Sequence, residues 1–147
     1  MIVQDNTTLV RTIYDVYNNH QSDPAWLDKF TASTAEDFEW VNVPLGLTLH
    51  GPEGHKQYPL GWSTGFPDSR VEVTNLALTE DGAVVKFVGH GTHTGPLHSP
   101  AGEIAPTGRR VEIHFCDVYR IRNGKFVSCH TYYDVMGLMQ QLGLIPS

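Results

Sequence analysis

The sequence VEIHFCDVYRI, residues 111–121, is the segment that decides the fold class. Apolar and polar side chains alternate along it, which is the period of a strand with one buried face. The apolar face carries Val111, Ile113, Phe115, Tyr119 and Ile121. The other face carries Glu112, His114, Cys116, Val118 and Arg120. A half-buried strand is therefore predicted over these residues.

Asp117 occupies a position on the apolar face, where the pattern calls for a hydrophobic side chain. A carboxylate on a core-facing surface costs free energy unless it is paired, hydrogen-bonded or held neutral. Such a group is more often part of a functional site than an accident. The structural alternative is a buried aspartate that accepts hydrogen bonds from backbone N–H groups or from Tyr119. Asp117 is therefore the first candidate catalytic residue.

Composition favours one globular domain spanning residues 1–147, because 40% of the residues are hydrophobic. The net charge is −6 and the ten Lys and Arg residues form no basic stripe, which argues against a nucleic-acid partner. We expect no membrane partner, since no apolar run is long enough to cross a bilayer. The N-terminus lacks a secretory signal pattern. Cys116 and Cys129 match no metal spacing and are expected to be free thiols in a reducing cytoplasm.

Helical periodicity dominates the first part of the chain. One helix is predicted to end at Asn18 and Asn19, and a second, short helix to begin at Asp23 and Pro24. Their apolar stripes are Leu9, Val10, Ile13, Val16 and Tyr17 in the first helix, and Trp26, Leu27 and Phe30 in the second. Residues 38–43 alternate as a strand. A weaker helical stretch follows over residues 51–65, which Pro59 is expected to kink or interrupt.

Period-two patterns fill most of the remaining chain. Strands are predicted over residues 70–78, 83–94, 111–121 and 126–133. A loop rich in Pro and Gly, residues 95–108, is long enough to form a rim or lid. Asp134 is predicted to cap a closing helix. Helices followed by an antiparallel meander indicate an α+β fold.

The Asn-Gly turn after residue 122 leaves two registers open for the hairpin that contains Asp117. A two-residue loop would set Asp117 opposite His130. A three-residue loop would shift the pairing by one residue, setting Cys129 and Thr131 beside Asp117 and turning His130 away. The three-residue loop separates apolar from polar side chains more cleanly, so we prefer it.

His93 shares a predicted inner face with Val85 and Phe87 on the strand over residues 83–94. If this strand joins the same curved sheet, His93 can approach Asp117 and form an acid–base pair in a mostly apolar cavity. Burial should raise the pKa of Asp117, whereas a protonated His93 would lower it. The candidate substrate-binding residues are Asn42, Trp40, Phe115, Cys129, Thr131 and Tyr133.

Several segments together resemble a known family. They are HGPEG (50–54), GFPDSRVEV (65–73), GTHTG (91–95), PTGRRVE (106–112), DVYRIRNGKF (117–126) and YYDVMGLMQQLG (132–143). The chain resembles the SnoaL-like polyketide cyclases of the nuclear transport factor 2-like superfamily, from about Leu9 to Gly143. The resemblance implies a cone-shaped α+β barrel, in which a curved antiparallel sheet packs against N-terminal helices and encloses one pocket. It also implies a homodimer or homotetramer built on the outer sheet face.

The resemblance also assigns roles to pocket residues. In the characterised cyclases a pocket aspartate is the general acid/base of an aldol closure that needs no metal or cofactor. Its position, three residues before the helix-capping aspartate, is occupied here by Thr131. A second polar pocket position, on the preceding strand, corresponds to Asp117. The carboxylate has therefore either moved one strand over, or the cyclase reaction is absent.

Three functions are compatible with these residues. The first is a cofactor-free enzyme acting on a small hydrophobic carbonyl compound, polyketide-like or terpenoid-like, by cyclisation, isomerisation, hydration or dehydration. Asp117 would be its base and His93 its acid, while Asn42 or Tyr133 would hydrogen-bond the enolate oxygen. The second is a non-catalytic ligand-binding or assembly module, for which Asp117→Leu should be tolerated or stabilising. The third is addition of water to an epoxide. No set of His and carboxylate residues converges, so no metal site is predicted.

Overall fold

The computed structural model describes residues 6–146. Its helices are α1 (Asn6–Asn18), α2 (Trp26–Phe30), α3 (Gly51–Gly65) and α4 (Val135–Gln141). Its strands are β1 (Thr34–Asn42), β2 (Leu47–His50), β3 (Arg70–Thr79), β4 (Gly82–Thr92), β5 (Leu97–Ser99), β6 (Gly102–Ile104), β7 (Arg110–Arg122) and β8 (Lys125–Tyr133). The short hairpin of β5 and β6 lies within the segment predicted to be a loop. The second helix begins at Trp26, slightly later than predicted.

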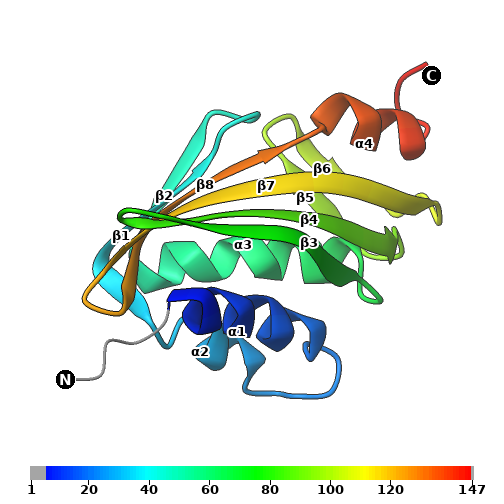
Figure 1. The fold of residues 1–147 in the computed structure, drawn as a ribbon. Coiled ribbons are helices and arrows are strands. Elements are labelled where there is room, and N and C mark those ends of the chain that lie inside the picture. The colour runs from blue at the N-terminus through cyan, green and yellow to red at the C-terminus, as the bar shows by residue number, and fades with distance from the viewer. Residues whose placement is uncertain (1–5, 147) are drawn as a thin grey trace.

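One curved sheet organises this part of the chain, with the strand order β2-β1-β8-β7-β4-β3. Neighbouring strands are antiparallel except for β1 and β8, which are parallel. The sheet arches over α1 and α3, and α4 lies beyond the far end of β8 (Figure 1). The predicted α+β fold, a curved antiparallel sheet against N-terminal helices, is confirmed, with one parallel strand pair added.

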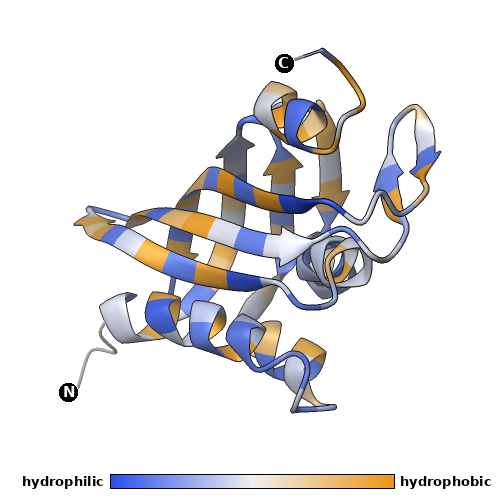
Figure 2. Ribbon diagram, turned by 90° about the vertical axis from the view of Figure 1, so that its right-hand side faces the viewer, coloured by the Kyte–Doolittle hydropathy of each residue, from blue (hydrophilic) through white to orange (hydrophobic). Residues whose placement is uncertain are grey.

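Strand β7 has the predicted alternation. Val111, Ile113, Phe115, Asp117 and Tyr119 are buried, and the residues between them are exposed or half-buried. Figure 2 shows the same alternation of apolar and polar residues along neighbouring strands of the sheet. The apolar face of β7 therefore turns toward the helices, and Asp117 turns with it.

The hairpin between β7 and β8 differs from the preferred prediction at its turn. Asn123 and Gly124 have φ angles of 54° and 72°, and Arg122 pairs with Lys125. Two consecutive residues with positive φ form the two-residue type I′ turn that Asn-Gly favours. The predicted three-residue loop is therefore wrong.

The faces of β8 farther along the hairpin nevertheless agree with the prediction. Pairing shifts between Arg120 and Ile121 because of an irregularity in the ladder at Val127. The bulge shifts the pairing by one residue in the direction opposite to a three-residue loop, which would have paired Asp117 with Cys129. Either shift leaves the same residues of β8 on the inner face. Asp117 consequently lies opposite Thr131, and His130 lies opposite Val118.

Helix α3 is continuous through Pro59, so the predicted interruption does not occur. A proline inside a helix removes one backbone hydrogen bond. Tertiary packing offsets that loss, because His55 stacks on Phe38 with ring centroids 4.2 Å apart and Tyr58 stacks on Trp40 at 4.8 Å. These contacts attach α3 to β1 and carry Tyr58 into the interior.

Candidate functional site

Asp117 is fully buried, and four hydroxyl groups donate hydrogen bonds to its carboxylate. Tyr14 donates to Oδ2 at 2.7 Å and Thr131 to Oδ1 at 2.8 Å. Tyr58 lies between both oxygens, at 3.1 Å from Oδ1 and 3.2 Å from Oδ2. Tyr119 lies 3.2 Å from Oδ2. The misfit in the strand pattern is therefore an aspartate enclosed by hydroxyl donors.

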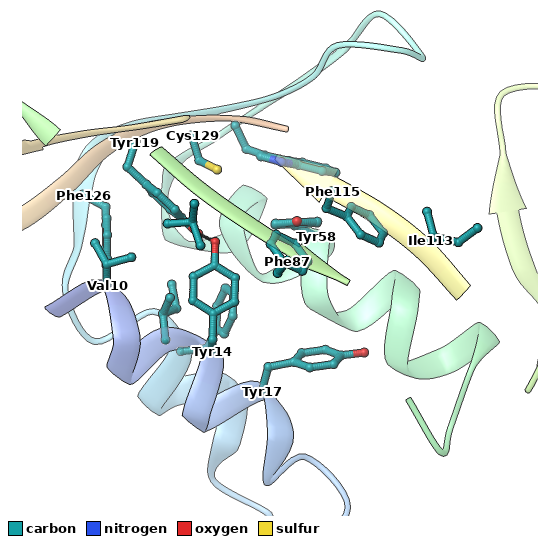
Figure 3. Packing of buried hydrophobic residues seen from close by; sticks show 14 of the residues in the cluster. Val10, Tyr14, Tyr17, Tyr58, Phe87, Ile113, Phe115, Tyr119, Phe126 and Cys129 are labelled. Carbon is teal, nitrogen blue, oxygen red and sulfur yellow. Dashed lines mark hydrogen bonds between the residues drawn. The ribbon is translucent and has the colours of Figure 1, made fainter. Parts of the chain in front are cut away.

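These donors come from four different elements around the sheet interior. Tyr119 follows Asp117 by two residues on β7 and so shares its face, and Thr131 is its cross-strand neighbour on β8. Tyr14 comes from α1 and Tyr58 from α3. Figure 3 shows Tyr14 rising from its helix toward Tyr119. The four donors meet only when the helices pack on the sheet.

Burial and hydrogen bonding act on the Asp117 carboxyl in opposite directions. Desolvation raises the pKa of Asp117, while the hydroxyls of Tyr14, Thr131, Tyr58 and Tyr119 lower it by stabilising the charged form; burial is the larger effect. Burial also raises the pKa of the three tyrosines well above their usual range. The tyrosine hydroxyls therefore remain protonated donors over the ordinary pH range.

A cavity lies next to this cluster, and Asp117 is part of its wall. Nine of its nineteen lining residues are Phe, Trp or Tyr, including Tyr14, Tyr58, Trp62, Phe87, Phe115 and Tyr119. The space open to the centres of water molecules is about 60 Å³, whereas a single water needs roughly 10–15 Å³. A small apolar molecule can enter such a cavity, and a larger one requires aromatic side chains to move.

The predicted substrate-binding residues divide into two groups. Phe115 belongs to the cavity wall, as does the predicted catalytic Asp117. The other five predicted residues are not part of that wall. Trp40, Cys129 and Thr131 are buried, and Asn42 Nδ2 donates to the Tyr133 hydroxyl at 3.1 Å. Asn42 also accepts a hydrogen bond from the backbone N–H of residue 45, which is the turn-forming role of an asparagine.

His93 is buried on the inner side, as the alternation predicts, but it does not reach Asp117. The residue of β4 that pairs with Asp117 is Val85, and His93 lies eight positions farther along the chain. At strand spacing this separates the two residues by about 25 Å. His93 Nδ1 instead accepts a 3.2 Å hydrogen bond from the Thr107 backbone N–H, which fastens the segment before β7. The predicted Asp117–His93 pair is therefore wrong.

The sequence reasoning missed Tyr14 and Tyr58, two of the closest partners of Asp117. A signal for both existed. Tyr14 lies four residues after Val10 and three before Tyr17, so it shares their helical stripe. Tyr58 follows His55 by three residues on the buried side of α3. A buried tyrosine needs a hydrogen-bond partner for its hydroxyl. A tyrosine on the buried face of a helix is therefore a candidate partner for a buried carboxylate.

Two further findings concern residues 6–146. No helix in that range is long and apolar enough to cross a membrane. In the same range, no three side chains of His, Cys, Asp or Glu gather closely enough to hold a metal ion.

Comparison with known proteins relates the chain to one family. The model of the SnoaL-like polyketide cyclase family matches residues 7–142. No curated protein sequence matches the chain significantly.

Solved structures show the same fold. A proposed SnoaL-like polyketide cyclase from Jannaschia sp. CCS1 aligns with a TM-score of 0.81 at 19% identity, covering 98% of this chain and 100% of its own. The proposed hydroxylase AclR from Streptomyces galilaeus aligns with a TM-score of 0.79 at 21% identity, covering 97% of this chain and 87% of its own. The proposed polyketide cyclase IdmH from Streptomyces antibioticus aligns with a TM-score of 0.74 at 22% identity, covering 95% of this chain and 99% of its own.

Proposed function

Because the chain belongs to the SnoaL-like polyketide cyclase family, we propose that it is a cofactor-free acid/base catalyst acting on a small hydrophobic carbonyl compound. One observation carries this proposal: a buried carboxyl group, Asp117, forms part of the wall of an aromatic cavity. Burial raises its pKa toward the range in which a carboxylate accepts and returns protons efficiently. The aromatic wall suits an apolar substrate.

In the proposed reaction Asp117 is the general base. Its carboxylate removes a proton from the carbon next to a substrate carbonyl, and the electron pair of that C–H bond moves onto the carbonyl oxygen as an enolate. The enolate then takes the proton back at another atom, giving isomerisation, or attacks a second carbonyl, giving ring closure. In ring closure the proton held by Asp117 passes to the new alkoxide. The substrate supplies every bonding electron, so no redox partner is required.

Tyr58 is the best placed group to stabilise the enolate oxygen. Its hydroxyl lies 3.1 and 3.2 Å from the two carboxylate oxygens, so its hydrogen bond to Asp117 is longer and weaker than the 2.7 Å bond from Tyr14. It also belongs to the cavity wall. A donor aimed at developing charge in a dry site lowers the barrier more than it does in water. In this proposal Tyr58 takes the enolate-stabilising role predicted for Asn42 or Tyr133, and protonated Asp117 takes the acid role predicted for His93.

Deuterium exchange tests the proposal without knowledge of the natural substrate. The protein is incubated in D₂O with a panel of aromatic ketones that includes 2-tetralone, and exchange next to the carbonyl is followed by NMR. We expect the wild type to accelerate exchange of at least one ketone, and Asp117→Asn to lose roughly 100-fold or more of that rate. Tyr17→Phe is the matched control in the same cavity wall. Equal exchange rates in Asp117→Asn and wild type would contradict the proposal.

A second candidate, a non-catalytic ligand-binding module, is favoured by one specific observation. An ionised carboxylate has about four acceptor sites, and four protein hydroxyls already occupy those of Asp117. This alternative predicts that the ketones bind without exchanging and that Asp117→Asn leaves their affinity unchanged. The epoxide alternative loses the acid partner named for it, since His93 is remote from Asp117.

A further inference from the structure

The Thr131 hydroxyl is held between two groups that fix the direction of its hydrogen bond. Trp40 Nε1 lies 2.9 Å from Thr131 Oγ1, and Thr131 Oγ1 lies 2.8 Å from Asp117 Oδ1. An indole N–H can only donate and an ionised carboxylate can only accept. The threonine oxygen therefore accepts from Trp40, and its single hydrogen is directed to Asp117. The result is a one-way chain from indole to hydroxyl to carboxylate.

Neither Trp40 nor Thr131 belongs to the cavity wall. Their exposed fractions are 5% and 0%, so both lie within the protein rather than against a ligand. Any influence they have on a bound molecule must pass through a neighbour. Trp40 has a second route to the same site, because its ring stacks on Tyr58 at 4.8 Å and 18°. One side chain thus supports two of the four donors to Asp117.

We propose that Trp40 and Thr131 are positioning residues for Asp117, in which the indole N–H commits the threonine hydroxyl to the carboxylate and so keeps Asp117 ionised and fixed in orientation. The position that carries an aspartate in the family's characterised cyclases is then a tuning position in this chain. The catalytic consequence rests on the proposed function. The hydrogen-bond relay itself does not, because it consists only of contacts between side chains of the protein.

The surroundings of Asp117 make this relay effective. The ionisable groups that face Asp117 from α1, α3, β7 and β8 are Tyr14, Tyr58, Tyr119 and Cys129. Burial raises the pKa of each well above its usual range, so all four stay neutral. Among residues 6–146, no ion pair involves Asp117. Neutral donors are therefore what stabilises this carboxylate, and losing one changes its proton affinity directly.

The test is the titration of the Asp117 carboxyl by carbon-detected NMR in the ligand-free protein, with Asp117→Asn identifying the signal. Thr131→Val keeps the shape and removes the hydroxyl, and we expect it to raise the Asp117 pKa by about one unit. Thr131→Ser keeps the hydroxyl and should restore the wild-type value. Trp40→Phe keeps the stacked ring and removes the N–H, and we expect a smaller rise.

The double variant Trp40→Phe/Thr131→Val separates the relay from general damage to the core. If the indole acts through the hydroxyl, the Trp40→Phe shift disappears when Thr131 is already valine. Equal Trp40→Phe shifts in both backgrounds, or no shift in Thr131→Val, would overturn the proposal. Should Thr131→Val fail to fold, an unchanged Asp117 pKa in Trp40→Phe would overturn it alone. A protein that shows the relay but no deuterium exchange would refute the proposed function and leave this inference intact.

Discussion

The hydroxyl of Tyr14 donates a 2.7 Å hydrogen bond to the carboxylate of Asp117, from a residue 103 positions earlier in the chain. The same hydroxyl lies 2.8 Å from that of Tyr119, which also approaches the carboxylate. Helix α1 is therefore joined to the sheet by a polar contact inside an otherwise aromatic core. The contact links the stability of the fold to the protonation of the candidate site.

Replacing Tyr14 by phenylalanine removes this contact and keeps the ring. We expect Tyr14→Phe to lower the free energy of unfolding by about 1.5–3 kcal/mol, the range for a hydrogen bond to a charged group. It should also raise the pKa of Asp117, because the carboxylate loses its shortest donor. Urea unfolding and the carboxyl titration measure the two effects.

Tyr17→Phe is the control for this variant. Tyr17 is on the same helix and in the same cavity wall, but its hydroxyl pairs with Ser69 at 2.6 Å rather than with Asp117. It should leave the Asp117 titration unchanged. A similar shift in both variants would mean that helix packing, and not the hydrogen bond, sets the pKa of Asp117.

Asp117→Leu tests whether the apolar pattern or the polar cluster governs this position. The strand pattern alone predicts that leucine is tolerated or stabilising. The structure reverses this expectation, because leucine would leave buried hydroxyls without their acceptor. We expect a loss of about 3 kcal/mol or more in the free energy of unfolding, and a smaller loss for Asp117→Asn. Wild-type stability in Asp117→Leu would contradict this prediction, because the hydroxyls of Tyr14, Tyr58 and Thr131 would then have found other acceptors.

His55 should make the fold sensitive to acid. It is fully buried, it accepts or donates one hydrogen bond with Thr34 through Nδ1, and burial lowers its pKa from 6.5 to about 3. The unfolded chain therefore binds a proton at a higher pH than the folded protein does. Stability from this residue is complete above pH 6.5 and falls as the pH decreases toward 3, by about 5 kcal/mol in total.

Urea unfolding at several pH values checks this effect. The slope of stability against pH between 6.5 and 3 should flatten in His55→Gln. The raised pKa of Asp117 acts in the opposite direction, so only the difference between variant and wild type isolates His55. An unchanged slope in His55→Gln would mean that the buried ring is protonated in the folded protein.

Two glycines should respond oppositely to alanine. A Cβ added at Gly95 would lie 1.9 Å from the backbone oxygen of Thr64, so backbone must move to accept it. We expect Gly95→Ala to destabilise the protein by about 3 kcal/mol or more. A Cβ at Gly61, within α3, meets nothing within 4 Å, and alanine there should stabilise by up to about 1 kcal/mol. Thermal unfolding compares the two variants. Similar changes in stability would contradict this expectation, because the backbone near Gly95 would then move enough to accommodate the added Cβ.

Local patterns predict much of this fold. The alternation in β7 correctly placed Phe115 and Asp117 on the inner face, and it placed Tyr119 where it meets the carboxylate. The hairpin shows the limit of such patterns. The Asn-Gly turn has its favoured two-residue form. An irregularity at Val127, which the sequence pattern did not predict, returns Cys129 and Thr131 to the inner face.

The site itself depends on distances that periodicity does not contain. Alternation correctly put His93 on the inner side. It lies eight residues beyond Val85, the residue that pairs with Asp117, so the two side chains are too far apart for a hydrogen bond. Tyr14 and Tyr58 reach Asp117 because separate helices pack against the sheet, and a stripe on a helix specifies a face rather than a partner. The helical pattern can therefore predict that these tyrosines are buried, but it cannot predict that they donate hydrogen bonds to Asp117.

The titration of Asp117 in the wild-type protein tests the central claim most directly. The claim is that burial outweighs four hydroxyl donors, which leaves a carboxyl group able to exchange protons. Carbon-detected NMR should then give a pKa above the ordinary aspartate value of about 3.9. A pKa at or below that value would contradict the account, because Asp117 would then be a permanently ionised anchor of the core.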